Sequence, residues 1–551
     1  MTEGEGGVEL FGELLDGRYD CADRVVVRAY CSLLQSPGGF RTWWRRWKGS
    51  DEELEDARLM RVAGRFARRV KAWSEDRRVP LLYAQAGERK DEMAEGYLPP
   101  DPSFTGVFLI VVNRAPGEVW HVERGEGGVI RYIERKRPRP YVNHYAFHIR
   151  DREWGHLIIR FCPHPPFNAL VILNGHEYVA GQAVRQGLAF RKEGNCFTEL
   201  SDAAGLGRIA ETLSSCESSA GRLVQVCERW IYSAVLCFAL EVAEQERTGF
   251  AYQYSVFQAE YSRNLLFTHG AELDRVFREL VDRTRGPLQI RTVRTLFGRK
   301  QRPHGRRRSR RGGSVEVVVE RPRYDLTVFK VHFGRRTLKI YTKGERVLRI
   351  EAIVHNAQEL RLGTGVDKLG PILGELRAMV DRFIELLDCV DVSFVDAGTL
   401  EELSTPGQVG RMRVGGIDLN QRRMRAVMEG VVALSVPPEG FTASALAGRV
   451  RDILADPAYG PSRAAYDLRK LRAKGLVTKV GQSRTYRADP EGLRAMTALL
   501  VLRDRVIKPL LAGTRRQSLA PPPKHLHPVD QQYRILQQEM GSLFQIVGIA
   551  A

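Results

Sequence analysis

The segment from 143 to 156, NHYAFHIRDREWGH, places three histidines and two carboxylates within fourteen positions. Residues four apart on a strand share a face, so His144 and His148 are expected to project together. His156 can join them across the REWG turn. Two or three imidazoles on one face of a sheet can bind Zn²⁺ or Mn²⁺. These residue types and their spacing therefore predict a divalent-metal site.

Two carboxylates near this segment could complete such a site. Asp151 stands at the expected strand end, where it can hold Mg²⁺, and Glu177 opens the following helix. A strand carboxylate and a helix carboxylate on one metal are what a phosphodiester nuclease needs. The alternative is structural: Asp151 caps a turn, the histidines pack at an interface, and Glu177 only favours the start of a helix.

A second candidate is the stretch TLKIYTKGERVLRIEAIVHN, residues 337–356. Strand alternation places Lys339, Tyr341 and Lys343 on one face of one strand, and Arg349 and Glu351 on one face of the next. Such a hairpin could hold phosphates, with Tyr341 as a stacking group or a nucleophile. The alternative is a ladder of polar side chains on a solvated sheet face.

Two resemblances follow from these strings. The strand sequence LRIE beside Y-x-K is similar to rolling-circle replication initiators, in which a tyrosine attacks DNA. In addition, YVNHYAFHIRDREWGH, NGHEYVAGQA, EGNCFT, YTKGERVLRIEAIVHN and AAYDLRKLRAKGL together resemble a set of bacterial proteins of about this length. The second resemblance covers most of the chain but implies no particular activity. A further polar cluster, QAEYSRN, could supply another carboxylate, Glu260.

Several classes of protein are not supported by the sequence. It has no P-loop, no G-x-G-x-x-G and no G-x-S-x-G, which leaves an ATPase, a dehydrogenase or a serine hydrolase without support. The eight cysteines include no C-x-x-C pair, which argues against a disulfide framework and a cysteine-based zinc site. No run of eighteen apolar residues and no signal-peptide pattern is found. We therefore expect a cytoplasmic protein with no membrane partner.

The charge points to a polyanionic partner. The formal net charge is +19, and two stretches, 299–311 and 463–487, carry fifteen of those nineteen charges. Concentration of positive charge in patches favours a nucleic-acid footprint over a generally arginine-rich composition. We interpret 298–313 as a basic linker or loop because it lacks apolar periodicity. Its expected nucleic-acid contacts are Arg306, Arg307, Arg308, Arg310 and Arg311.

The elements that must position these residues indicate a multidomain α+β protein, with central, mainly antiparallel β-sheet regions, helices and a C-terminal winged helix-turn-helix. Short β-branched and aromatic runs separated by Gly/Pro turns predict the sheets. The expected regions are 1–98, helical; 99–297, a β-meander plus helices; 298–313, the linker; 314–414, a second β-rich unit with a helix; 415–515, a winged helix; and 516–551, a Pro-rich tail with a short helix.

Residues 415–515 read as three helices followed by a hairpin and a further helix, with Thr442 as a cap. This order is typical of a winged helix-turn-helix, whose second motif helix enters the major groove. In that third helix Ala465, Leu468 and Leu471 take the buried spacing. The residues expected to contact nucleic acid are Arg463, Arg469, Lys470, Arg472 and Lys474 on the helix, and Lys479 and Arg484 on the wing.

The sequence thus predicts a nucleic-acid-binding protein, with DNA favoured over RNA. Its catalytic candidates are Asp151, Glu177, Tyr341 and Glu351, and the cofactor would be Mg²⁺, Mn²⁺ or Zn²⁺. The activity would be that of a metal-dependent nuclease, or of a strand-transfer or replication-initiation protein of a mobile element. The alternatives are a non-enzymatic winged-helix regulator and an enzyme for a phosphate ligand that uses the histidines as acid–base groups.

Overall fold

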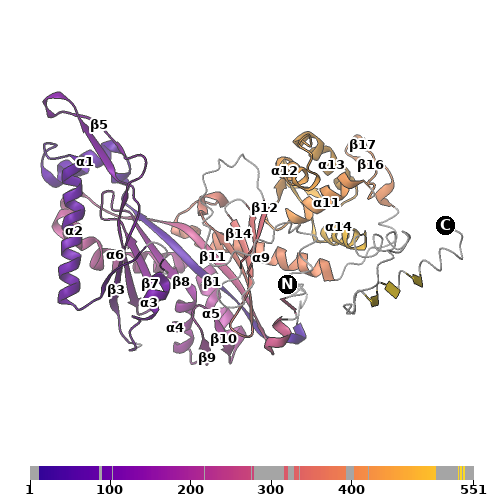
Figure 1. Ribbon diagram of the computed structural model, residues 1–551, viewed down its shortest axis with the longest axis horizontal. Helices are drawn as coiled ribbons and strands as arrows, with labels where there is room; N and C mark the ends of the chain where they lie inside the picture. Colours follow the sequence, from indigo (N-terminus) through magenta and orange to yellow (C-terminus); the bar gives the residue numbers. More distant parts are fainter. Residues whose placement is uncertain are drawn as a thin grey trace, which may run out of the picture. The chain divides into compact units, whose positions relative to one another are not determined.

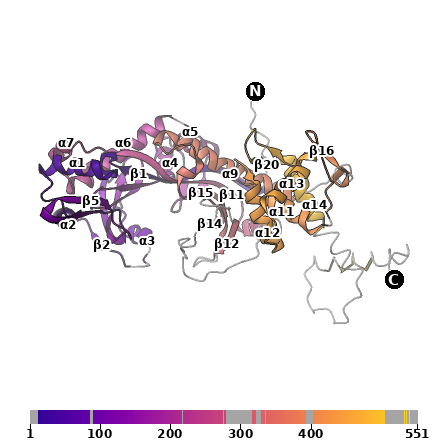
Figure 2. The ribbon, with the colours of Figure 1, turned by 90° about the horizontal axis from the view of Figure 1, so that it is seen from above.

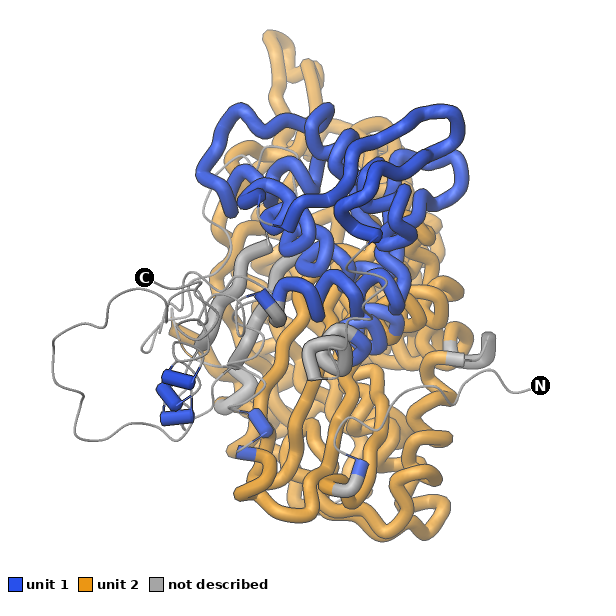
Figure 3. The backbone as a smooth tube through the Cα atoms, turned by 90° about the vertical axis from the view of Figure 1, so that its right-hand side faces the viewer, with its two compact units in different colours: residues 1–13, 274–334, 378–551 blue, residues 14–273, 335–377 orange. Residues whose placement is uncertain are grey.

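The computed structural model describes residues 12–277, 315–391 and 402–503, apart from short gaps at 86–87, 89, 102, 216, 275, 321–327, 334–335 and 420. A few residues between 531 and 539 are also described. The chain divides into two compact units, coloured separately in Figure 3. The first unit comprises 14–273 with 335–377 and is the orange unit 2 of Figure 3; the second unit comprises 1–13, 274–334 and 378–551 and is the blue unit 1. The arginines expected at 306–311 lie outside the described residues, as does most of the tail.

The first unit is built on a large mixed sheet. Its strands follow the order β14-β15-β11-β1-β8-β7-β6-β3-β2, antiparallel except for the parallel pair β2 and β3. The strands are β1 (Leu15–Tyr30), β2 (Leu81–Tyr83), β3 (Gly106–Pro116), β6 (Tyr141–Asp151), β7 (Gly155–Phe161), β8 (Ala169–Asn174), β11 (Gln253–Phe267), β14 (Arg336–Lys343) and β15 (Val347–Val354). Hairpins β4 (Trp120–Arg124) with β5 (Ile130–Arg135), and β9 (Phe190–Lys192) with β10 (Phe197–Leu200), stand beside it.

The long strand β1 corrects the expectation that 1–98 is mostly helical. It spans sixteen residues and pairs with β11 on one side and β8 on the other, as Figure 1 shows. Helices do form after it, namely α1 (Pro37–Lys48), α2 (Asp56–Asp76) and α3 (Lys90–Glu95). The run VVVRAY carried the strand signal, but the neighbouring charged residues interrupt its alternation. Strands from the expected regions 1–98, 99–297 and 314–414 consequently share one sheet.

One face of the sheet is apolar and closed by helices. Phe147 on β6 and Phe161 on β7 are fully buried on this face. Phe66 of α2 packs 5.0 Å from the Phe161 ring, measured between centroids. Phe238, in the short turn η4 (Leu236–Phe238), stacks on Phe147 at 6.3 Å. Burial of such large aromatic surfaces is the main stabilising contribution of this layer.

The opposite face, here called the polar face, carries charged and apolar side chains in alternation across the strands. Register places Arg28 beside Leu170, and Leu170 beside Arg160. All three are only partly buried, and Arg24 is exposed. The polar face is defined by Arg24 and Arg28 of β1, Ile158 and Arg160 of β7, and Leu170 and Ile172 of β8. Because one face is closed and the other partly accessible, sheet-borne chemistry is expected on the polar face.

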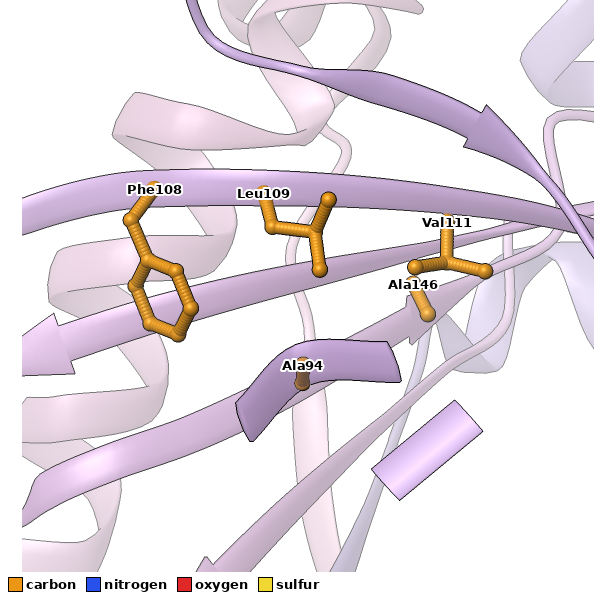
Figure 4. Close-up of a cluster of buried hydrophobic side chains, with 5 residues drawn as sticks. All are labelled: Ala94, Phe108, Leu109, Val111 and Ala146. Atoms are coloured by element: carbon orange, nitrogen blue, oxygen red, sulfur yellow. The ribbon is translucent and has the colours of Figure 1, made fainter. Parts of the chain in front are cut away.

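The β3 end of the polar face is closed by the short helix α3. Phe108 lies at a β-bulge, which directs its side chain to the same side as its neighbour Leu109. Figure 4 shows both pointing with Val111 toward Ala146 and Ala94 of α3. All five side chains are buried, so this end of the face is a small apolar core rather than an open surface.

The remaining helices of this unit are α4 (Gly175–Arg185), α5 (Ala203–Ser215), α6 (Glu217–Ala234) and α7 (Val242–Thr248). Helices α6, α4 and α5 follow one another in this order along the sheet, as Figure 2 shows. Asn174 caps α4 by accepting a hydrogen bond from the His176 amide. The other short 3-10 turns are η1 (Gly12–Leu14), η2 (Ser32–Gln35), η3 (Glu126–Gly128), η5 (Ala357–Leu360) and η6 (Val366–Lys368). Helix α9 (Leu369–Asp391) follows, and β12 (Val315–Glu320) pairs with β13 (Val328–Phe333).

The C-terminal part of the second unit contains helices and short hairpins. The order is β16 (Gly407–Val409), β17 (Met412–Val414), α11 (Arg422–Ala433), β18 (Phe441–Thr442), α12 (Ala443–Leu454), α13 (Pro461–Ala473), β19 (Thr478–Lys479), β20 (Thr485–Arg487) and α14 (Pro490–Leu502). Thr442 caps α12 by accepting from the Ala445 amide, as predicted. Strands β18, β20 and β19 form one small sheet. The buried side of α13 differs from the prediction, because Ala464 and Asp467 are buried and Ala465 is only partly so.

No single helix among the described residues has both the length and the apolar character needed to cross a membrane. One pair of helices, Ala220–Phe238 and Val242–Thr248, meets that requirement only together and is bent by 100° at its break.

Candidate functional site

The hairpin of β14 and β15 brings together the residues of the second predicted cluster. Its register sets Lys339 opposite Glu351 and Tyr341 opposite Arg349. The Lys339 Nζ lies 3.0 Å from Glu351 Oε2, and the Tyr341 hydroxyl donates to the same oxygen at 3.4 Å. The face-sharing predicted from alternation is therefore present. One oxygen of the Glu351 carboxylate thus accepts from both the Tyr341 phenol and the Lys339 ammonium.

The neighbouring strand β11 adds a second carboxylate, Glu260. Burial, followed by the negative charge of Glu351, raises the pKa of Glu260 to about 7. Its Oε1 accepts a hydrogen bond from Gln258 Nε2 at 2.6 Å. The sequence had indicated Glu260 as a further carboxylate within the polar cluster QAEYSRN. The fold places it within electrostatic range of Lys339 and Glu351.

The protonation states around Tyr341 follow from burial and charge. Burial, and then the charge of Glu351, raises the pKa of the Tyr341 phenol well above its usual value. Burial acts against the ammonium form of Lys339, but Glu351 and Glu260 outweigh it and raise that pKa. Burial and the nearby Arg349 lower the pKa of Lys343 to about 8. At neutral pH Tyr341 therefore keeps its proton, and two ammonium groups flank it.

Beneath this cluster lies a buried group of Asp23, His176 and Arg349, all at most 2% exposed. A β-bulge between Ala22 and Arg24 places Asp23 as the extra residue of β1. The His176 Nδ1 lies 2.7 Å from Asp23 Oδ1, and Arg349 Nη1 lies 3.3 Å from Asp23 Oδ2. Burial opposes ionisation of Asp23, but these two neighbours outweigh it and lower its pKa. The carboxylate is ionised, and it fixes the Arg349 guanidinium.

The remaining donors of Arg349 are also used, which holds its side chain in one position. Its Nε donates to Asn264 Oδ1 at 2.7 Å, and its Nη2 donates to the Asn195 carbonyl at 2.5 Å. The same Nη2 lies 3.3 Å from His176 Nε2. Because a guanidinium can only donate, Nε2 accepts, and the proton of the neutral imidazole belongs on Nδ1, facing Asp23. Burial, the largest effect, lowers the pKa of His176 and keeps it neutral.

A glycine allows α4 to deliver His176 to this position. A Cβ atom added to Gly175 would lie 1.8 Å from the carbonyl oxygen of Ala22, on the bulged part of β1. Only a residue without a side chain permits this approach of the helix to the strand. The sequence string NGHE therefore positions His176 through its glycine as well as through its Asn174 cap.

The histidines of the first predicted cluster are only partly brought together. His148 Nδ1 lies 3.1 Å from His156 Nε2, so these two meet across the β6–β7 turn as expected. His144 shares the face of His148 but stands four residues earlier on β6, which is about 13 Å along a strand. Its Nδ1 lies 3.2 Å from the Val142 carbonyl oxygen, and it lines a different part of the polar face.

Asp151 and Glu177, the predicted metal carboxylates, have other partners. Asp151 Oδ1 accepts from the amides of Glu153 and Trp154, and its Oδ2 accepts from Arg229 and from the Trp230 indole. Glu177 Oε1 receives Lys192 Nζ at 2.5 Å. Over the part of the chain that the structure describes, no three His, Cys, Asp or Glu side chains are grouped as a metal site would need.

The basic residues predicted on α13 and its following hairpin differ in their surroundings. Lys470 Nζ donates to the Gly416 carbonyl at 3.1 Å, and Lys474 Nζ donates to Thr405 Oγ1 at 2.9 Å. The segment 405–416, which contains β16 and β17, therefore contacts the C-terminal half of α13. In contrast, Arg463, Lys479 and Arg484 are exposed, as are Arg411 and Arg413 on the β16–β17 hairpin. Arg472 is partly buried and Arg469 Nη1 lies 3.5 Å from Met412 Sδ.

Comparisons with known proteins were made for the whole chain. No family model matches it, and no curated protein matches it. Among solved structures, it is similar to the rolling-circle replication initiator protein from Geobacillus stearothermophilus, at 9% identity and a TM-score of 0.19. That match covers 66% of this chain and 83% of the initiator. A likeness at this level does not bear on fold or function.

Proposed function

We propose that this chain is a nucleic-acid-binding protein that transfers a DNA strand to Tyr341. The observation that supports this most is the shared oxygen of Glu351, which lies 3.4 Å from the Tyr341 hydroxyl and 3.0 Å from Lys339 Nζ. A tyrosine nucleophile needs a base, and a phosphodiester needs positive charge at the attacked phosphate. Both are within the β14–β15 hairpin.

The proposed step forms one bond and breaks one. The Tyr341 hydroxyl oxygen attacks a backbone phosphorus atom, and its proton passes to the Glu351 carboxylate. A P–O(tyrosine) bond forms, and the bond from phosphorus to one deoxyribose oxygen breaks. The departing oxygen takes a proton from the Lys339 ammonium. Because the pKa of Tyr341 is raised, the phenol is not ionised beforehand and this transfer to Glu351 is required.

The charges around Tyr341 favour binding of a phosphate. Lys343 is partly exposed on the same strand face, and Arg24 is exposed at the neighbouring part of the polar face. Arg349 is buried, but its fixed positive charge faces Tyr341 across the register. Such an arrangement stabilises negative charge that develops on the phosphate without a reorganisation of side chains.

The C-terminal helices are proposed to be a winged helix that binds the DNA. The order α11, β18, α12, α13 and the β19–β20 hairpin supports this interpretation. Exposed Arg463 at the start of α13 and exposed Lys479 and Arg484 on the hairpin are suited to phosphate contacts. Lys470 and Lys474 are less suited, because their ammonium groups already bind within the protein.

The test is a nicking assay on supercoiled plasmid and on single-stranded DNA. The assay is run with Mg²⁺, with Mn²⁺ and with a chelator. The sequence predicted a divalent metal, whereas the Lys339 ammonium is the cation next to Glu351 in the structure, and these conditions separate the two cases. Tyr341→Phe is expected to abolish cleavage, and Glu351→Gln to reduce it by roughly 10²–10⁴-fold as the base is lost. Tyr83→Phe, at an exposed tyrosine on β2 of the same sheet, is the matched control.

A non-enzymatic DNA-binding regulator is the second candidate. The exposed basic residues of α13 and its hairpin would serve it equally well, without any use of the sheet. Salt-sensitive binding with no cleavage under any metal condition would favour the regulator and rule out the transfer centre. Cleavage that persists in Tyr341→Phe but is lost in Asp151→Ala would favour the predicted metal-dependent nuclease instead.

A further inference from the structure

A cleft of about 440 Å³ opens on the first unit at some distance along the sheet from Tyr341. This volume falls in the range of small-molecule and cofactor sites. Among its lining residues are Arg28, Arg139 and Arg160, with Glu118 as the one carboxylate. The lining therefore carries a net positive charge. An anionic ligand is the class that such a cleft would attract.

Two of the three arginines of the cleft, Arg28 and Arg139, are held in position by Glu118. Its Oε1 lies 2.9 Å from Arg139 Nη2, and its Oε2 lies 3.5 Å from Arg28 Nη2. Asn168 Nδ2 donates to the same Oε2 at 2.8 Å. Arginine forks that are fixed in this way lose little conformational entropy on binding a phosphate. The cleft thus has an ordered phosphate-binding wall.

The cleft is also lined by an exposed aromatic ring, Phe257. The pairing of β1 with β11 shifts between Val26 and Val27, which leaves Phe257 as an extra residue of β11. At this second bulge Phe257 lines the cleft, as Arg28 does, and the Phe257 side chain is 38% exposed. A bulge that turns a large apolar side chain toward solvent is a feature of binding sites more than of cores. A nucleobase can stack on such a ring.

We infer that this cleft binds a nucleotide, with the base stacked on Phe257 and the phosphate held by Arg28 and Arg160. The inference deepens the proposed function, and it rests on that function where the ligand is part of a nucleic-acid strand rather than a free nucleotide. The nucleotide is either one residue of a nucleic-acid strand that lies along the polar face or a free nucleotide. The chemistry of recognition is the same in both cases.

The experiment uses the full chain with Tyr341→Phe, so that no strand transfer interferes. Thymidine oligonucleotides of increasing length are titrated by fluorescence anisotropy, and thymidine monophosphate and ATP by equilibrium dialysis. Phe257→Leu, which keeps apolar volume but removes the ring, is expected to weaken oligonucleotide binding about tenfold. Phe257→Trp is expected to restore it. Tyr97→Ala, at an exposed aromatic residue outside the cleft, is the control.

The two sources give different results. If the ligand is one nucleotide of a nucleic-acid strand, the affinity should rise with oligonucleotide length. Iodouracil-substituted DNA should then also photocrosslink to the peptide that contains Phe257. A free nucleotide predicts saturable mononucleotide binding that Arg28→Gln and Phe257→Leu both abolish. The inference is overturned if Phe257→Leu and Arg28→Gln bind every probe as tightly as the Tyr97→Ala control. Failure of the proposed function would appear separately, as an absence of cleavage by the chain with Tyr341 intact while crosslinking to Phe257 persists.

Discussion

At the scale of single residues, the charge state of each group in the site depends on its neighbours. Glu351 is buried, and one of its carboxylate oxygens accepts from both the Lys339 ammonium and the Tyr341 phenol. Asp23 lies deeper and is paired with both Arg349 and His176. Removing one partner of a buried ion pair leaves an uncompensated charge, which typically costs about 3–5 kcal/mol. We therefore assign to Asp23 the role of positioning Arg349, and to Glu351 the role of the base that takes the Tyr341 proton.

Glu260 should make stability depend on pH. Its pKa is raised from an ordinary value of 4.5 to about 7 in the folded protein. Between these values the folded state binds more protons than the unfolded state, so the free energy of unfolding falls as pH rises through this range. Glu260→Gln should remove that dependence. Urea unfolding midpoints of both proteins from pH 4.5 to 8 check this, and curves that stay parallel would contradict the assignment.

Alternation along the strands was enough to group Lys339, Tyr341 and Glu351, because each lies two residues from the next charged or aromatic position on an unbroken strand. The same rule could not find Asp23 or Phe257. Both stand at bulges, where one extra residue reverses the alternation, and no local sequence signal marks those two positions. His176 stands next to the predicted carboxylate Glu177, but its contact with Asp23 spans more than 150 positions and needed the fold.

At the scale of elements, α4 must approach β1 closely for His176 to reach Asp23. Gly175→Ala would place a Cβ 1.8 Å from the Ala22 carbonyl oxygen, and we expect it to lower the free energy of unfolding by about 1–3 kcal/mol. Gly181→Ala on the same helix meets nothing closer than 3.6 Å, and it should be neutral or raise stability by up to about 1 kcal/mol. Denaturant unfolding followed by tryptophan fluorescence compares the two. Equal effects of both substitutions would argue against the close approach.

Helix α13 and its hairpin should contribute unequally to DNA binding. Arg463→Ala and Arg484→Ala remove exposed cations, and each should reduce the slope of log affinity against log salt by about 0.9 if each contacts one phosphate. Lys474→Ala removes an ammonium that already donates to Thr405, so its slope should stay near that of the unaltered protein. Duplex binding measured over a salt series checks this. A larger change for Lys474→Ala than for Arg463→Ala would refute the assignment.

At the scale of the whole molecule, the sequence predicted the α+β class and the order of the C-terminal elements, because caps, glycine stops and periodicity are local signals. It did not predict that strands from three expected regions form one sheet. That result depends on β1, whose pairing partners β8 and β11 lie far away in the sequence. The predicted metal cluster illustrates the same limit, since strand parity places side chains on a face but does not bring His144 and Asp151 into one site.

The central claim is that Tyr341 accepts a DNA strand, and a covalent adduct tests it most directly. The protein is incubated with end-labelled single-stranded DNA, denatured, digested, and analysed by mass spectrometry for a nucleotide-linked tyrosine. The account predicts an adduct on the peptide that contains Tyr341, absent in Tyr341→Phe and diminished in Glu351→Gln. An adduct on another residue, or undiminished cleavage by Tyr341→Phe, would contradict it.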